Sequence, residues 1–178
     1  MVCPSLFEQL SHIEKLDNLI QKYEQKNPGI AHAKNPIGIT SSSLEGNIFS
    51  ITSTIPAVKF SVISAADWKT RFAPPSIYEY LLHMILLTTI RYRLHEVGAR
   101  INEHSVDDYS EAYFDKVMEK NDLSNIICNG HFKEEDKEII REFLGKEAFD
   151  SYEYVLSLSW LQDENLQKRV HFRPECFK

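Results

Sequence analysis

The segment C-N-G-H at residues 128–131 has the residue types and spacing of half a metal site. A thiolate and an imidazole three residues apart around a glycine turn can share one zinc ion, and a structural zinc needs four ligands. Further candidate ligands are His104, Cys3, His95 and Cys176. No second C-x-x-C or H-x-x-x-H pair completes the set. We therefore expect a buried Cys128 followed by a Gly-His turn and no cofactor. The alternative is a zinc site that includes His104, Cys128 and His131.

A second pair of chemistry-bearing residues is Glu79 and His83, which lie four positions apart in an apolar segment. At this spacing the two side chains share one face of a helix and can form a hydrogen bond. A buried carboxylate–imidazole pair can act as general acid and base. Buried histidines also serve as ordinary structural residues. We favour the structural interpretation and expect no catalytic residues, with Glu79 and His83 as the catalytic alternative.

The sequence H-E-V-G-A at residues 95–99 resembles the start of a zinc-peptidase helix. That motif needs histidines at i and i+4 so that both reach one metal ion, and here the second position is Ala99. His95 also follows two arginines, where a helix end would favour positive charge. We therefore interpret this segment as a helix end. The sequence also lacks phosphate-loop, dinucleotide-binding and G-x-S-x-G motifs.

Residues 103–153 are strongly acidic, with 15 acidic against 6 basic residues. The first part of this stretch carries a dense group of carboxylates: Glu103, Asp107, Asp108, Glu111 and Asp115. Their spacing is not that of a calcium loop. A solvated acidic face, or a docking surface for a basic partner protein, explains them more simply. We expect the partner to bind around Glu103, Asp107, Asp108 and Glu111.

Several elements must position these residues. The S-x-x-E capping box at residues 5–8 predicts a helix over residues 6–25, and β-rich segments between residues 30 and 68 predict three short strands in a mostly antiparallel sheet. A second capping box at residues 76–79 predicts a helix to about residue 93. That helix is apolar on nearly every side, which is typical of a buried central helix.

The C-terminal half is predicted to be mainly helical. Residues 112–120 predict a short helix, and residues 134–144 a stronger one that ends at Gly145. Residues 149–161 fit either a strand or a helix, and we favour the helix. The expected fold class is α+β in a single domain over residues 1–178. Its parts are 1–26 (N-terminal helix), 30–68 (strands), 76–93 (central helix), 103–161 (acidic, mainly helical) and 167–178 (tail).

Composition excludes several classes of protein. The chain has 178 residues, 43% hydrophobic, and a net charge of −6, so neither a disordered chain nor a generally basic nucleic-acid binder is expected. Three cysteines do not make a disulfide framework. No signal peptide is recognised, and the longest apolar stretch, residues 80–90, is shorter than the roughly 20 residues that span a bilayer. We expect a cytoplasmic protein that is not in the membrane.

The order of these segments resembles minimal metzincin-type zinc peptidases, the archaemetzincins especially. Residues 39–49 look like the family's first strand motif, and V-I-S-A-A-D-W at residues 62–68 looks like its second. The helix with Glu79 and His83 stands where the metal helix would be, and residues 127–131 resemble the late cysteine knuckle, with His131 in place of a second cysteine. The H-E-x-x-H core and most late cysteines are absent. The resemblance implies an α+β scaffold that has lost catalysis.

Residues 74–80, P-P-S-I-Y-E-Y, also resemble prokaryotic proteins in which such a helix precedes a cysteine knuckle. Because no catalytic set is complete, we expect a non-catalytic protein-binding or adaptor subunit of a prokaryotic multi-protein system, with phage defence as one setting. One alternative is a zinc-dependent hydrolase. Another is a regulator that senses a small ligand through the turn at residues 40–47.

Overall fold

The computed structural model describes residues 22, 25, 26, 36–44, 50–55, 58–68, 75–102, 111–115 and 120–162. The elements in these ranges are β1 (Ile37–Thr40), β2 (Ser50–Ile55), β3 (Val58–Ser64), α2 (Ile77–Glu96), α3 (Lys120–Asn129), α4 (Glu134–Leu144), α5 (Lys146–Leu156) and a 3₁₀ helix, Ser159–Gln162. The helix expected over residues 6–25 lies outside the described residues except at positions 22 and 25, which are helical, as is residue 26. The tail at residues 167–178 also lies outside them.

The sheet is mixed, with the strand order β1-β3-β2. β2 and β3 are antiparallel, from Ser50 opposite Ile63 to Ile55 opposite Val58. β1 lies on the other side of β3 and runs parallel to it, with Ile39 opposite Ile63. The strand at the centre is therefore β3, and its Ile63 is fully buried.

The expected fold class, α+β with a mostly antiparallel sheet, is wrong. One of the two strand pairings is parallel, and most of the described residues are helical. The prediction assumed that strands consecutive in sequence pair with one another, which is the commoner arrangement. The apolar β3 instead takes the central position, and β1 pairs with it across the chain rather than with its sequence neighbour β2.

Helix α2 begins at the predicted capping box. The hydroxyl of Ser76 accepts a hydrogen bond from the N–H of Tyr78 at 3.3 Å, and the carboxylate of Glu79 accepts one from the N–H of Ser76 at 2.8 Å. These bonds satisfy amides that the first helical turn leaves without partners. Eight residues of α2 are buried: Tyr80, His83, Met84, Leu87, Thr88, Ile90, Tyr92 and Leu94.

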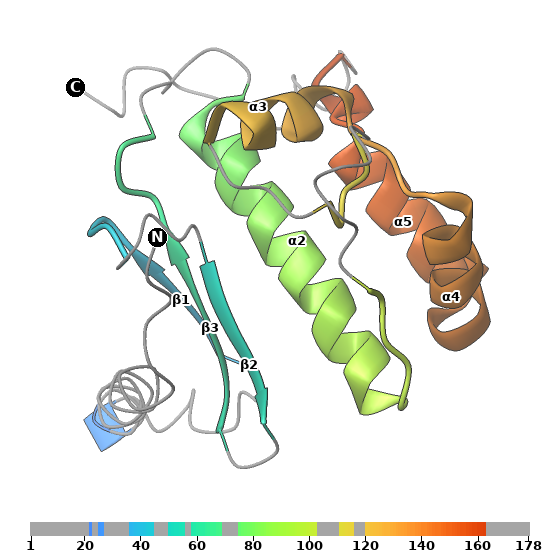
Figure 1. Cartoon of the computed structure of the whole chain (residues 1–178), viewed down its shortest axis with the longest axis horizontal. Coiled ribbons are helices and arrows are strands. Elements are labelled where there is room, and N and C mark those ends of the chain that lie inside the picture. The colour runs from blue at the N-terminus through green and yellow to red at the C-terminus, as the bar shows by residue number, and fades with distance from the viewer. Residues whose placement is uncertain are drawn as a thin grey trace.

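Figure 1 shows α2 between the sheet and the helices α4 and α5. On the sheet side, Ile63 packs in one apolar cluster with Tyr80 and Met84 of α2 and with Leu123 and Ile127 of α3. The larger cluster lies on the opposite side of α2, against α4, α5 and residues 111–115. Its fully buried members include Ile90, Leu94, Phe114, Ile140 and Phe149. The helix therefore separates two cores, which explains why it has almost no polar face.

The C-terminal half differs from expectation in two places. Residues 112–115 form no helix: Ala112 pairs with His131 in an isolated bridge. Helix α3 was not predicted, because its sequence K-N-D-L-S-N-I-I-C-N is rich in weak helix formers. Helix α4 has the predicted bounds and ends at Gly145, whose φ is 89°. Residues 149–156 are helical, as favoured above.

No helix within the described part of the chain is both long and apolar enough to cross a membrane.

Candidate functional site

One corner of the fold, where the first turns of α2 pack against α3, holds four of the predicted chemistry-bearing residues: Glu79, His83, Cys128 and His131. The segment after α3 is fixed to residues 111–115 by two backbone hydrogen bonds. The N–H of His131 donates to the carbonyl of Glu111 at 3.0 Å, and the N–H of Tyr113 donates to the carbonyl of His131 at 2.9 Å. We call this group, residues 111–115 with 130–133, the clamp. The clamp places the ring of Tyr113 over α2.

Gly130 allows the backbone of the clamp to pack closely against the end of α3 and the ring of Tyr113. Its N–H donates to the carbonyl of Ile126 at 2.8 Å, which ends α3. A Cβ atom at position 130 would lie 2.2 Å from that carbonyl oxygen and 2.7 Å from the ring of Tyr113. Only glycine fits such close backbone and aromatic contacts. The C-N-G-H motif therefore has a structural explanation, as a helix end packed against an aromatic ring.

Cys128 is exposed and forms no disulfide. Partial burial of the thiol, together with the negative charge of Glu79, raises its pKa. A raised pKa keeps the thiol protonated, whereas nucleophiles and metal ligands need the thiolate. The ring of His131 is exposed as well. The expected burial of Cys128 is wrong.

No group of three His, Cys, Asp or Glu side chains is arranged to hold a metal ion in the part of the chain that the structure describes. His104, Cys3 and Cys176 lie outside that part. A metal site formed by His104, Cys128 and His131 therefore stays a prediction. Of these three residues, the structure describes Cys128 and His131, and both are exposed.

His83 is the most unusual polar residue of the corner. It is 2% exposed, and neither ring nitrogen has a hydrogen-bond partner. Its ring meets the ring of Tyr113 edge-on, with centroids 5.4 Å apart. Burial, with a smaller effect of the positive charge of Arg91, lowers the pKa of His83 to about 3. The imidazole is therefore uncharged at neutral pH.

The expected hydrogen bond between Glu79 and His83 is absent. The carboxylate of Glu79 caps α2 through the N–H of Ser76, and both nitrogens of His83 are unpaired. Without a carboxylate partner or contact with water, the imidazole has no route for moving a proton. Burial also raises the pKa of Tyr113 to about 12, helped by the charge of Glu153, so the phenol stays protonated. This corner holds an apolar packing arrangement around one polar ring, and the pair has no acid–base geometry.

The other segments singled out in the sequence have structural roles. His95 lies in the last turn of α2, as the helix-end interpretation predicted, and the chain leaves the helix before the buried Ala99. In the serine-rich turn after β1, the hydroxyl of Ser64 donates to the carbonyl of Ser42 at 2.8 Å, and Ser43 donates to the carboxylate of Asp67 at 3.3 Å. These bonds tie the turn to the end of β3. Residues 45–47 lie outside the described part.

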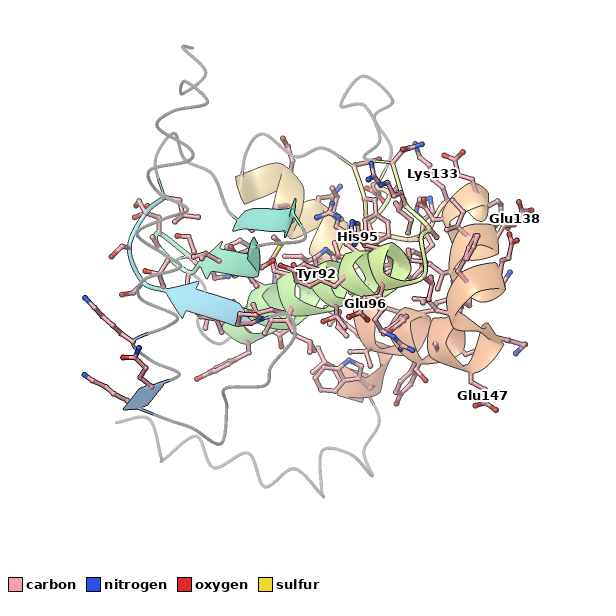
Figure 2. All side chains as sticks on the ribbon, turned by 90° about the horizontal axis from the view of Figure 1, so that it is seen from below. Tyr92, His95, Glu96, Lys133, Glu138 and Glu147 are labelled. Carbon is pink, nitrogen blue, oxygen red and sulfur yellow. The ribbon has the colours of Figure 1, made fainter. Side chains whose placement is uncertain are left out.

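The acidic surface predicted around Glu103, Asp107, Asp108 and Glu111 falls mostly outside the described residues. Glu103, Asp107 and Asp108 are outside the described residues, and the carboxylate of Glu111 accepts a hydrogen bond from Asn125 at 2.7 Å. The described acidic surface is on α4 and α5, and we define it by four exposed residues whose carboxylates form no hydrogen bond or ion pair with other described residues: Glu138, Glu142, Glu147 and Glu153. Figure 2 shows Glu138 and Glu147 pointing outward from these helices.

Two exposed aromatic side chains accompany the acidic surface. Phe143 on α4 is 43% exposed and Tyr154 on α5 is 45% exposed. The sequence did not reveal either one: Phe143 has the helical spacing of the apolar residues Ile139 and Ile140, and Tyr154 falls in the segment 149–161 that fits either a strand or a helix. A helical-wheel comparison would have found Tyr154, which lies four positions after Asp150 and seven after Glu147 on the polar side of α5.

Comparison with known proteins adds no assignment: no family model, no curated protein and no solved structure matches this chain.

Proposed function

We propose that this chain is a non-catalytic, cytoplasmic protein-binding subunit of a multi-protein assembly. The observation that supports the proposal is the surface of α4 and α5, where unpaired carboxylates stand beside exposed aromatic rings. Glu138 and Glu142 lie at i and i+4 on α4, where two like charges oppose helix formation. A basic partner would relieve that repulsion, and Phe143 and Tyr154 supply the aromatic contacts that protein interfaces favour.

The remaining charges of this region are engaged locally. Lys137 forms an ion pair with Glu134 at 2.6 Å, and Lys146 forms one with Asp150 at 2.5 Å. The guanidinium of Arg141 lies over the ring of Phe149, 4.2 Å from its centroid. These cations are therefore not aimed at Glu138 or Glu142. The excess negative charge would act on a partner rather than within the two helices.

The test is capture of partners from the native host with wild-type protein and with the double variant Glu138→Lys/Glu142→Lys. We expect a partner that wild type retains at low salt, that the double variant loses, and that elutes as salt rises, because exposed charges are screened. Glu96→Lys is the control for position: it makes one such charge change, half the total of the double variant, at the end of α2, where a cation suits the helix dipole. A partner that binds both variants equally would contradict the proposal.

Measuring the metal content distinguishes the alternative function, a zinc-dependent hydrolase, from the protein-binding function. One zinc per chain, lost when Cys128 and His131 are changed to alanine, would favour the zinc-dependent hydrolase or a zinc-structured protein. A ligand-sensing role for the turn at residues 40–47 would instead give a thermal shift with a small metabolite.

A further inference from the structure

The outer edge of β1 has no neighbouring strand among the described residues. β1 is an edge strand of the sheet, and its ladder with β3 uses one side of its backbone: Ser61 donates to the carbonyl of Pro36 at 3.0 Å and Ala65 donates to that of Thr40 at 2.8 Å. Backbone groups alternate in direction along a strand, so the N–H and C=O of Ile39 face away from β3. No described residue pairs with that side of β1.

The side chain of Ile39 is exposed, although it lies on the core face of the sheet. Ile37, two residues earlier and on the same face, packs against the cluster formed by Ile63, Tyr80 and their neighbours. Ile63, which is opposite Ile39 in the ladder, is fully buried, whereas Ile39 is 54% exposed. The apolar layer that α2 covers therefore ends at Ile39 with an uncovered edge.

Edge strands are usually protected from pairing by charged residues, prolines or bulges. The sequence of β1, I-G-I-T, has no charged residue and no proline, and the protective features in the described residues around it are its short length and Pro36 just before it. A weakly protected edge with an exposed isoleucine is the arrangement that accepts an added strand.

We propose that an extended segment of a partner protein adds to the sheet along β1, with an apolar side chain over Ile39. This inference rests on the proposed protein-binding function and names one way in which the partner is held. Main-chain hydrogen bonds to Ile37 and Ile39 supply the affinity, and the apolar residue extends the layer formed by Ile63.

Two observations favour a peptide segment over a second copy of this chain. The area that a strand of four residues can bury is well below the roughly 800 Å² per partner of a standard protein interface. Strand addition by a peptide needs much less area. Among the described residues near the end of β1, Ser43 fixes the exposed carboxylate of Asp67 beside the turn that follows the strand, which places a negative charge there. A segment with a lysine or arginine flanking its apolar residues complements that charge.

The probe is an array of short peptides, about seven residues each, in which valine and threonine alternate and either lysine or glutamate flanks them. We expect lysine-flanked peptides to bind wild-type protein and to protect the amide of Ile39 from hydrogen exchange. Ile39→Pro removes the outward N–H and leaves the ladder with β3 intact, because proline is tolerated at an edge position whose N–H faces solvent. It should weaken binding about tenfold or more.

Ile39→Thr is the matched control, since it keeps the N–H and the β-branched shape and replaces apolar surface with a hydroxyl group. It should retain more binding than Ile39→Pro. Thermal unfolding of both variants should match wild type, because Ile39 is exposed. Equal binding of the peptides to wild type and Ile39→Pro, or no binding to wild type, would overturn the inference.

Sedimentation tests whether a second copy of the chain binds at β1. A wild-type dimer that Ile39→Pro converts to monomer would show that another copy, and not a peptide, occupies the edge, and would overturn the inference.

The α4 variant Glu138→Lys/Glu142→Lys should bind the peptides like wild type. If the peptides fail while a host partner still depends on α4, docking at β1 is wrong and the protein-binding function stands. If the peptides bind and no host partner depends on α4, docking at β1 stands and the surface of α4 and α5 is not the contact region.

Discussion

Replacing His83 by leucine should reduce the sensitivity of the fold to acid. The imidazole is buried without hydrogen-bond partners, and its pKa is lowered to about 3 from an ordinary value of 6.5. Because the folded-state pKa lies below the unfolded one, the unfolded chain takes up a proton first as the pH falls. The stability associated with the uncharged ring is therefore complete above pH 6.5 and is lost between pH 6.5 and about 3.

The size of the effect follows from proton linkage. In this window the unfolded state binds one more proton than the folded state. The free energy of unfolding therefore falls by about 1.4 kcal/mol for each unit by which the pH is lowered. Between pH 6.5 and 5 the loss is therefore roughly 2 kcal/mol. At pH 7.5 the variant should be close to wild type or more stable, because leucine removes two unpaired buried nitrogens.

The assay is urea unfolding followed by tryptophan fluorescence, at several pH values between 7.5 and 5. Groups other than His83 titrate in both proteins, so the difference between wild type and His83→Leu isolates this one ring. His131→Ala is the control, because the His131 ring is exposed, and it should keep the wild-type pH dependence. If wild type and His83→Leu lose stability in parallel from pH 6.5 to 5, the reasoning about a buried uncharged ring is refuted.

Three further changes test the surrounding structure. Gly130→Ala should cost more than about 1 kcal/mol in chemical denaturation, because its Cβ would overlap the carbonyl of Ile126; unchanged stability would contradict the packing of the clamp. Ser76→Ala should cost about 1 kcal/mol, since it removes the capping hydroxyl of α2, and Ser76→Asp should restore most of it. Ile90→Ala should cost about 2–5 kcal/mol because Ile90 is fully buried; a loss below about 0.5 kcal/mol would place it at the surface.

Local sequence signals predicted the helices whose ends are chemically marked. The Ser76 capping box located the start of α2, and the spacing of Ile139, Ile140, Phe143 and Leu144 before Gly145 located α4, although Phe143 is exposed in the structure. Helix α3 carries no comparable signal and owes its form to the burial of Leu123, Ile126 and Ile127 against α2. Tertiary packing overrides weak propensity there, and periodicity within the segment could not reveal it.

Pairing between distant segments was the least predictable part. Nothing local to β1 distinguishes a strand that pairs with β2 from one that pairs with β3. The same limit applies to the candidate site. Glu79 and His83 have the spacing of a hydrogen-bonded pair, but Glu79 is taken by the Ser76 amide, and Tyr113, 30 positions after His83, covers the imidazole. A competing local partner and a distant aromatic ring together decide the chemistry of that pair.

The two proposed contact regions act over different distances, and this makes them physically separable. Exposed carboxylates on α4 and α5 attract a basic partner across several ångströms of water, so they influence mainly the rate of association and weaken with salt. Backbone groups along β1 act only at hydrogen-bond distance and depend little on salt, so they influence mainly dissociation. A partner held by both would show a salt-dependent association rate and a dissociation rate that is nearly independent of salt. A complex whose association and dissociation both respond strongly to salt would be held by the acidic surface alone.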